Sequence, residues 1–104
     1  PYCDVWPVQN DPLDAAGPVV SDAPTLLMSG RYDPVTPASF ADEAAETLSD
    51  SKHLVFRSGG HGVTFWFDCA TKLAARFFEA PNPDGVPFPR CRDYTDAADF
   101  ALRF

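Results

Sequence analysis

Two short apolar runs flank a helical stretch, and this order constrains the fold more than any other feature of the sequence. The runs are residues 25–28 (Thr-Leu-Leu-Met) and residues 53–56 (His-Leu-Val-Phe). Runs of this kind suit strands buried on both faces of a parallel sheet, although periodicity alone also allows a short helical segment. Strand, helix and strand in this order form a βαβ unit with a right-handed crossover, so the strands are predicted to lie parallel.

The stretch between the runs carries helix signals. Thr36 is a suitable N-cap residue, and Pro37 would occupy the first helical position, where its missing N–H costs nothing. Apolar side chains then recur on one face as far as about residue 49, with acidic side chains on the other face. The pattern predicts an amphipathic helix, with its apolar face formed by Phe40, Ala41, Ala44, Ala45 and Leu48.

A second helical pattern follows at residues 64–79 and ends before Pro81. Residues 1–24 hold five of the 11 prolines and show no apolar period, so we expect an irregular lead-in segment. Residues 25–91 form the expected α/β region, and residues 92–104 form a tail in which Phe100, Ala101 and Phe104 could make one helical turn.

The expected elements do not close a core. A parallel sheet needs cover on both faces and more than two strands for independent stability. The chain begins Pro1-Tyr2-Cys3, with neither an initiator Met nor a basic and apolar leader. We therefore expect an α/β fold that is incomplete as an isolated domain, with the missing part upstream in a longer polypeptide.

Charge and composition exclude two classes of partner. The formal net charge is −7 and Lys and Arg form no cluster, which argues against nucleic-acid binding. No apolar run reaches the roughly 20 residues that span a bilayer. Three cysteines leave one over after a single pair, which in an exported protein indicates a partner upstream or a free thiol. Three unrelated buried thiols in a cytosolic protein remain the alternative.

Asp33 and His61 each follow one of the predicted strands after a short turn. Parallel strands end at the same edge of a sheet and lie about 5 Å apart, so a carboxylate–imidazole hydrogen bond is within reach. Such a pair can serve as the acid and base of a serine-hydrolase triad. Taken singly, Asp33 reads as an ordinary turn residue and His61 as an ordinary loop residue.

The other histidine, His53, stands at a strand entrance and is expected to be structural. A metal site is a weak third reading, because Cys3, His53, His61, Cys69 and Cys91 lack the close paired spacing of zinc ligands.

Residues 23–37 include the motif Gly30-Arg31-Tyr32-Asp33-Pro34-Val35-Thr36-Pro37. This segment resembles the acid-bearing "G-x-x-D-P-V-T-P" turn of the tripeptidyl-aminopeptidase-like (TAP-like) α/β-hydrolases. Gly60-His61-Gly62, with Cys69 and a Pro-rich loop closing on Cys91, is similar to the catalytic-histidine segment of that family. Cys3-Asp4-Val5-Trp6-Pro7 resembles its "C-x-x-W-P" motif. The resemblance covers about residues 3–91.

The resemblance implies a C-terminal βαβα portion of an α/β-hydrolase fold, with Asp33 as the triad acid and His61 as the base. It also implies a disulfide between Cys69 and Cys91, an exported protein, and no cofactor. A disulfide that closes a loop of about 20 residues stabilises by roughly 3 kcal/mol in the chain-entropy model. Cys3 is left for a partner upstream.

The nucleophile is missing from the sequence. In α/β-hydrolases it lies on a G-x-S-x-G elbow that precedes the acid and the histidine, and no serine here has that context. We therefore expect the upstream part of the same hydrolase to supply the serine, and an aminopeptidase acting on peptides as the whole enzyme. An esterase or lipase acting on ester substrates, or a non-catalytic exported binding module, remains the alternative.

Overall fold

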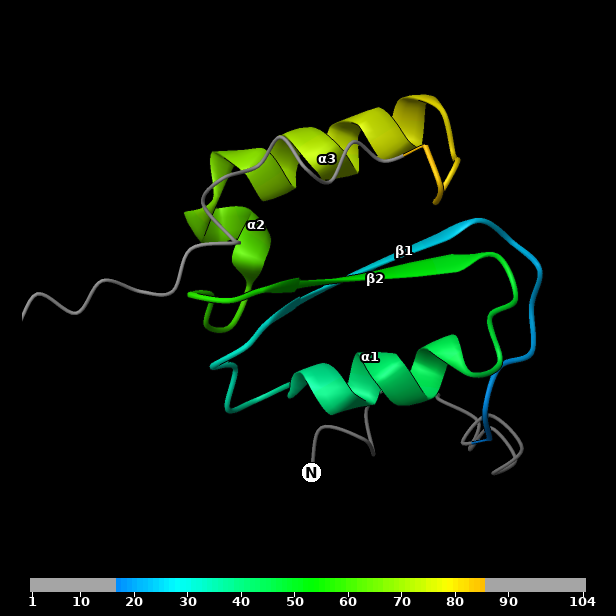
Figure 1. Ribbon diagram of the computed structural model, residues 1–104, viewed down its shortest axis with the longest axis horizontal. Helices are drawn as coiled ribbons and strands as arrows, with labels where there is room; N and C mark the ends of the chain where they lie inside the picture. Colours follow the sequence, from blue (N-terminus) through cyan, green and yellow to red (C-terminus); the bar gives the residue numbers. More distant parts are fainter. Residues whose placement is uncertain (1–16, 86–104) are drawn as a thin grey trace, which may run out of the picture.

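The computed structural model describes residues 17–85, which form a two-stranded parallel sheet with helices on both faces (Figure 1). Strand β1 spans Thr25–Gly30 and strand β2 spans Ser51–Phe56, with Thr25 paired to Ser51 and Gly30 to Phe56. Helix α1 spans Ala38–Ala45 and connects the strands. The predicted parallel βαβ unit is confirmed.

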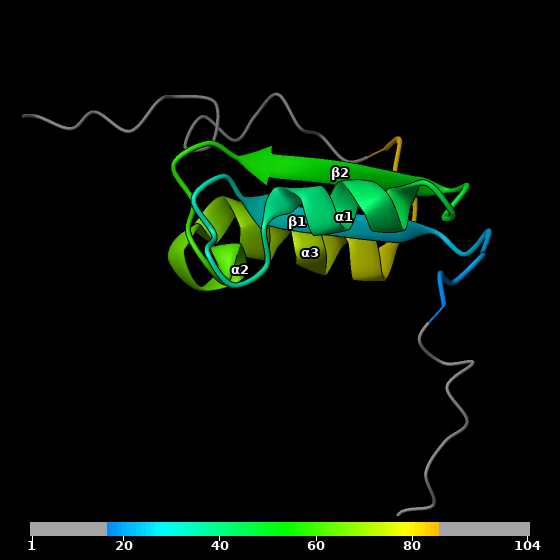
Figure 2. The same cartoon turned by 90° about the horizontal axis from the view of Figure 1, so that it is seen from below.

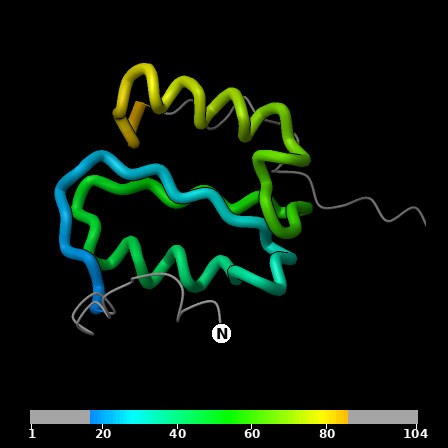
Figure 3. The backbone as a smooth tube through the Cα atoms, turned by 180° about the vertical axis from the view of Figure 1, so that it is seen from behind, coloured from blue at the N-terminus to red at the C-terminus, as the bar shows by residue number. Residues whose placement is uncertain are grey.

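The helices lie in layers on either side of the sheet. Helix α1 covers one face, and the short helix α2 (Val63–Trp66) with the longer α3 (Asp68–Glu79) covers the other (Figures 2 and 3). Both strands run toward the end of the sheet at which α2 lies. The turns that follow β1 and β2 therefore share one edge, as expected for parallel strands.

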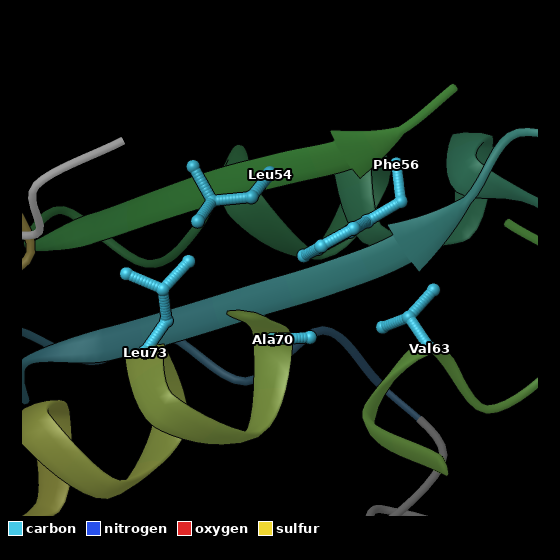
Figure 4. Close-up of a cluster of buried hydrophobic side chains, with 5 residues drawn as sticks. All are labelled: Leu54, Phe56, Val63, Ala70 and Leu73. Carbon is cyan, nitrogen blue, oxygen red and sulfur yellow. The ribbon is translucent and has the colours of Figure 1, made fainter. Parts of the chain in front are cut away.

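The core lies between β2 and the α2–α3 layer. Alternate residues on a strand point to the same face, and the β2 side chains Leu54 and Phe56 are almost fully buried. They meet the side chains of three helical residues, Val63, Ala70 and Leu73 (Figure 4). Five hydrophobic side chains are buried among the described residues, which makes this core small for an independent domain.

Helix α1 differs from its prediction at both ends. Its N-cap residue is Pro37 rather than Thr36, and no side chain caps it. The helix ends at Ala45, because Leu48 pairs with Ser21 in a short parallel bridge instead of continuing the helix. Helix α1 has no buried residue, and the apolar face predicted for this segment is only partly covered in the described part of the chain. Phe40, at 60%, and Ala44 are exposed, whereas Ala41, Ala45 and Leu48 are half-buried.

The second predicted helix is two helices. Phe67 adopts an extended conformation (φ −121°, ψ 108°) that separates α2 from α3. Its ring packs against the ring of Phe56, with centroids 5.4 Å apart. A continuous helix would keep one axis across residue 67, whereas the break lets α2 and α3 pack on the sheet independently. The apolar residues of this pattern differ in burial: Ala70 and Leu73 are buried, whereas Trp66 and Phe78 are exposed.

Candidate active site

The turns after β1 and β2 are hydrogen-bonded to each other. The N–H of Arg31 donates to the Phe56 carbonyl at 2.9 Å, and the N–H of Tyr32 donates to the Gly59 carbonyl at 2.9 Å. Gly30 makes this approach possible, because a Cβ there would collide with the Gly59 and Gly60 carbonyl oxygens. The residues that follow these turns, Asp33 and His61, are therefore held at one edge of the sheet.

Asp33 and His61 form a direct contact. Nδ1 of His61 lies 2.9 Å from Oδ2 and 3.1 Å from Oδ1 of Asp33. The Asp33 side chain is 4% exposed, whereas that of His61 is 57% exposed. A buried carboxylate behind an accessible imidazole is the order of groups that a triad acid and base require. The structure thus brings together the two site residues that the sequence indicated.

Asp33 remains ionised because of its hydrogen bonds. Burial raises its pKa, but hydrogen bonds from the Thr36 backbone and hydroxyl group, from the Val35 N–H and from His61 outweigh burial and hold the pKa well below its usual range. The N–H groups of Val35 and Thr36 lie 2.8 and 2.9 Å from Oδ1. An ionised carboxylate accepts a hydrogen bond from the Nδ1–H group of His61 and can stabilise the imidazolium ion.

His61 is anchored through its backbone. The indole Nε1 of Trp66 donates to the His61 carbonyl at 3.0 Å. The next residue, Gly62, has φ of +74°, a left-handed conformation that favours glycine, and it starts α2. Within residues 17–85 no group is hydrogen-bonded to Nε2 of His61. With Nδ1 directed to Asp33, Nε2 is the atom available to exchange a proton with a nucleophile.

Thr36 joins this site, which sequence reasoning did not anticipate. Its hydroxyl group donates to Oδ2 of Asp33 at 2.7 Å and lies 3.3 Å from Nδ1 of His61. The residue had been expected to cap α1. The spacing Asp-x-x-Thr could have revealed the contact, because Asp and Thr side chains commonly form local hydrogen bonds two to three residues apart.

His53 belongs to a separate hydrogen-bonded chain. Its Nδ1 lies 2.7 Å from Oδ1 of Asp42, and its Nε2 lies 2.9 Å from Oγ of Ser29. Ser29 is buried and the His53 side chain is only 10% exposed, whereas the Asp42 side chain is 71% exposed. A catalytic triad needs an accessible serine and a buried carboxylate, whereas here the serine is buried and the carboxylate is exposed. These hydrogen bonds instead link α1 to both strands, which agrees with a structural role for His53.

The cysteines are only partly described. Cys69 is half-buried and packs against the core from the start of α3. Cys3 and Cys91 lie outside the described residues, as do the tail at 92–104 and most of the lead-in segment. The disulfide between Cys69 and Cys91 therefore stays a prediction.

No group of three His, Cys, Asp or Glu side chains among residues 17–85 is arranged to hold a metal ion. None of the helices described there has the length and apolar character needed to cross a membrane. A cavity of about 430 Å³ lies between α1 and residues 17–19, and neither Asp33 nor His61 lines it.

The chain matches a known protein family. A protein-family model described as TAP-like protein matches residues 1–87, which is most of the 104-residue chain. No curated protein and no solved structure matches the chain. The family match covers Asp33, Thr36 and His61 and also takes in the lead-in segment.

Proposed function

Because the chain belongs to the TAP-like family of α/β-hydrolases, we propose that it is the C-terminal part of an exported serine hydrolase, an aminopeptidase that cleaves peptides from their N-terminus. Asp33 is the acid of its triad and His61 is the base. The observation that carries the proposal is the contact between the buried Asp33 carboxylate and Nδ1 of the accessible His61 imidazole, at 2.9 Å.

The proposed chemistry follows from this contact. Nε2 of His61 takes the proton of a serine hydroxyl as its oxygen attacks the substrate carbonyl. The Asp33 carboxylate stabilises the imidazolium ion, which then gives the proton to the leaving amine. A water molecule then attacks the acyl-enzyme by the same steps, with His61 taking its proton and returning it to the serine oxygen as the acyl group leaves. The serine and the oxyanion-hole donors are contributed by the upstream part of the same polypeptide, since no serine of this chain lies in a G-x-S-x-G motif.

Labelling with a fluorophosphonate probe of active-site serines tests the triad roles in the full natural polypeptide. His61→Ala should slow labelling at least 10³-fold, and Asp33→Asn should reduce turnover about 10⁴-fold. The matched controls are His53→Ala, which removes the other histidine, and Asp22→Asn, which alters an exposed aspartate. Undiminished labelling after His61→Ala would show that His61 is not the base.

A substrate panel tests the class of reaction. Chromogenic peptides with a free N-terminus should be hydrolysed, and the same peptides with an acetylated N-terminus should not. Hydrolysis of p-nitrophenyl esters alone would favour an esterase. A polypeptide with no labelled serine and no hydrolysis of any of these substrates would favour a non-catalytic binding module.

A further inference from the structure

Thr36 contacts both members of the candidate acid–base pair, Asp33 and His61. Its backbone N–H donates to Oδ1 of Asp33 at 2.9 Å, and its hydroxyl group donates to Oδ2 at 2.7 Å. The two carboxylate oxygens are thus held by two donors of one residue. This arrangement restricts rotation of the carboxylate about its terminal bond, and so fixes the plane in which it meets His61.

The hydroxyl group also faces the imidazole. Oγ1 of Thr36 lies 3.3 Å from Nδ1 of His61. A hydroxyl group has one proton and two lone pairs, and an ionised carboxylate has no proton to give. The 2.7 Å contact between Oγ1 and Oδ2 therefore requires the Thr36 proton to lie between these two oxygens. The side of Oγ1 that faces His61 is then a lone pair.

Every described polar atom around Nδ1 of His61 is consequently an acceptor. These atoms are Oδ1 and Oδ2 of Asp33 and Oγ1 of Thr36. Three acceptors favour the tautomer that carries its proton on Nδ1 and leaves the lone pair on Nε2. Without the Thr36 hydroxyl group, Oδ2 of Asp33 keeps only the contact with Nδ1 of His61 among the described donors, and the carboxylate becomes freer to rotate.

We propose that Thr36 is a positioning residue of this site, whose hydroxyl group orients the Asp33 carboxylate and holds His61 in the tautomer with Nε2 free to accept a proton. The catalytic consequence rests on the proposed function. Thr36 itself touches neither the nucleophile nor the substrate in this assignment. It acts through the two residues that it contacts.

Thr36 lies at the surface, so its replacement creates no cavity in the core. Thr36→Val keeps the shape of the side chain and removes the hydroxyl group, whereas Thr36→Ser keeps the hydroxyl group and removes the methyl group. Thr47→Val is the matched control. The Thr47 hydroxyl group also donates a 2.7 Å hydrogen bond, to the Val19 carbonyl, and Thr47 follows the end of α1 opposite to Thr36.

The kinetic test measures kcat and KM of the full natural polypeptide on a free N-terminal peptide substrate. Loss of one hydrogen bond to a charged group should lower kcat about tenfold in Thr36→Val and leave KM unchanged. Thr36→Ser and Thr47→Val should stay within about twofold of the wild type. A Thr36→Val enzyme with the wild-type kcat, or a Thr36→Ser enzyme as slow as Thr36→Val, would overturn the proposal.

The tautomer is measured separately, by ¹⁵N NMR of the imidazole nitrogens near neutral pH. In the neutral imidazole of His61, the wild type and Thr36→Ser should carry the proton on Nδ1, and Thr36→Val should show a mixture of tautomers. An unchanged Nδ1–H tautomer in Thr36→Val would refute the positioning role. This readout needs no turnover, so it tests Thr36 even if the natural polypeptide hydrolyses no substrate and the proposed function fails.

Discussion

Gly30 and Gly59 lie in backbone contact across the two turns that carry the candidate acid and base. A Cβ built on Gly30 would lie only 2.5 Å from the Gly59 carbonyl oxygen, closer than real Cβ atoms come. The same turns are joined by the hydrogen bond from the Tyr32 N–H to the Gly59 carbonyl, at 2.9 Å. The separation of Asp33 from His61 thus depends on the absence of a side chain at residue 30.

Gly30→Ala should therefore push the turns apart. We expect a loss of about 1–3 kcal/mol in the free energy of unfolding, as for other overpacked sites, and a large loss of serine-probe labelling. Chemical denaturation and labelling of the full natural polypeptide measure both. Gly60→Ala is the control, because a Cβ at Gly60 meets nothing within 4 Å. Equal stability and labelling in the two variants would contradict the role given to Gly30.

The pH dependence of stability should report the hydrogen bonds of Asp33. The folded-state pKa of this carboxyl group lies well below its ordinary value of 3.8, so its ionised form stabilises the folded state. This contribution is fully present above the unfolded-state pKa and is lost as the pH falls from there through the folded-state pKa.

Comparison of the wild type with Asp33→Asn isolates that contribution. The difference in free energy of unfolding should shrink as the pH falls below about 4, where the carboxyl group of the unfolded chain becomes protonated. Denaturation curves at a series of pH values measure it, and Asp22→Asn serves as the control. A difference that grows as the pH falls below about 4 would have the wrong sign for a carboxyl group with a lowered pKa.

His53 should matter for stability and not for chemistry. It bridges Ser29 on β1 and Asp42 on α1. Its replacement by alanine removes both hydrogen bonds and leaves the buried Ser29 hydroxyl group without this partner. We expect His53→Ala to lower the free energy of unfolding by about 1–3 kcal/mol while labelling per folded molecule is retained.

A double-mutant cycle with Ser29→Ala checks that this loss comes from the bridge. A coupling energy near zero between the two replacements would show that the contact contributes nothing. Labelling that fell in His53→Ala as far as in His61→Ala would instead point to a catalytic role for His53.

The Cys69–Cys91 disulfide is a prediction of the family resemblance, and its partner lies outside the described residues. Peptide mapping of the natural protein without reduction should recover the two cysteines in one cross-linked peptide pair. Cys91→Ser should lower the free energy of unfolding by roughly 3 kcal/mol. Recovery of Cys69 linked to Cys3 would show that the assigned pairing is wrong.

The local elements were largely predictable from patterns of neighbouring residues. The runs at residues 25–28 and 53–56 are strands, extended in the structure to Thr25–Gly30 and Ser51–Phe56, and they lie parallel. The apolar runs are shorter than the strands because four residues that take part in the ladder are not apolar: Ser29, Gly30, Ser51 and Lys52. Hydrogen bonding of the backbone, and not hydrophobicity, decides where a strand ends.

The helices show where local patterns fail. The apolar period through residues 64–79 is compatible with one helix. In the structure the extended backbone of Phe67, whose ring packs on Phe56, separates α2 from α3. The helix predicted to about residue 49 stops at Ala45, because Leu48 pairs with Ser21. Both changes come from contacts between residues distant in the chain, which periodicity within one segment does not contain.

By itself the sequence determined the βαβ order, the placement of Asp33 and His61 at one sheet edge, and the absence of a G-x-S-x-G nucleophile motif. The first two follow from local hydrophobicity and from the geometry that all parallel sheets share, and the third is read directly from the sequence. Only the tertiary structure decided that Thr36 holds the Asp33 carboxylate instead of capping α1, and that Gly30 sets the distance between the turns. As an N-cap, the Thr36 hydroxyl oxygen would accept a hydrogen bond from a backbone N–H of the helix. In the structure the hydroxyl group instead donates to Oδ2 of Asp33 at 2.7 Å, because the folded turn after β1 brings these two groups together.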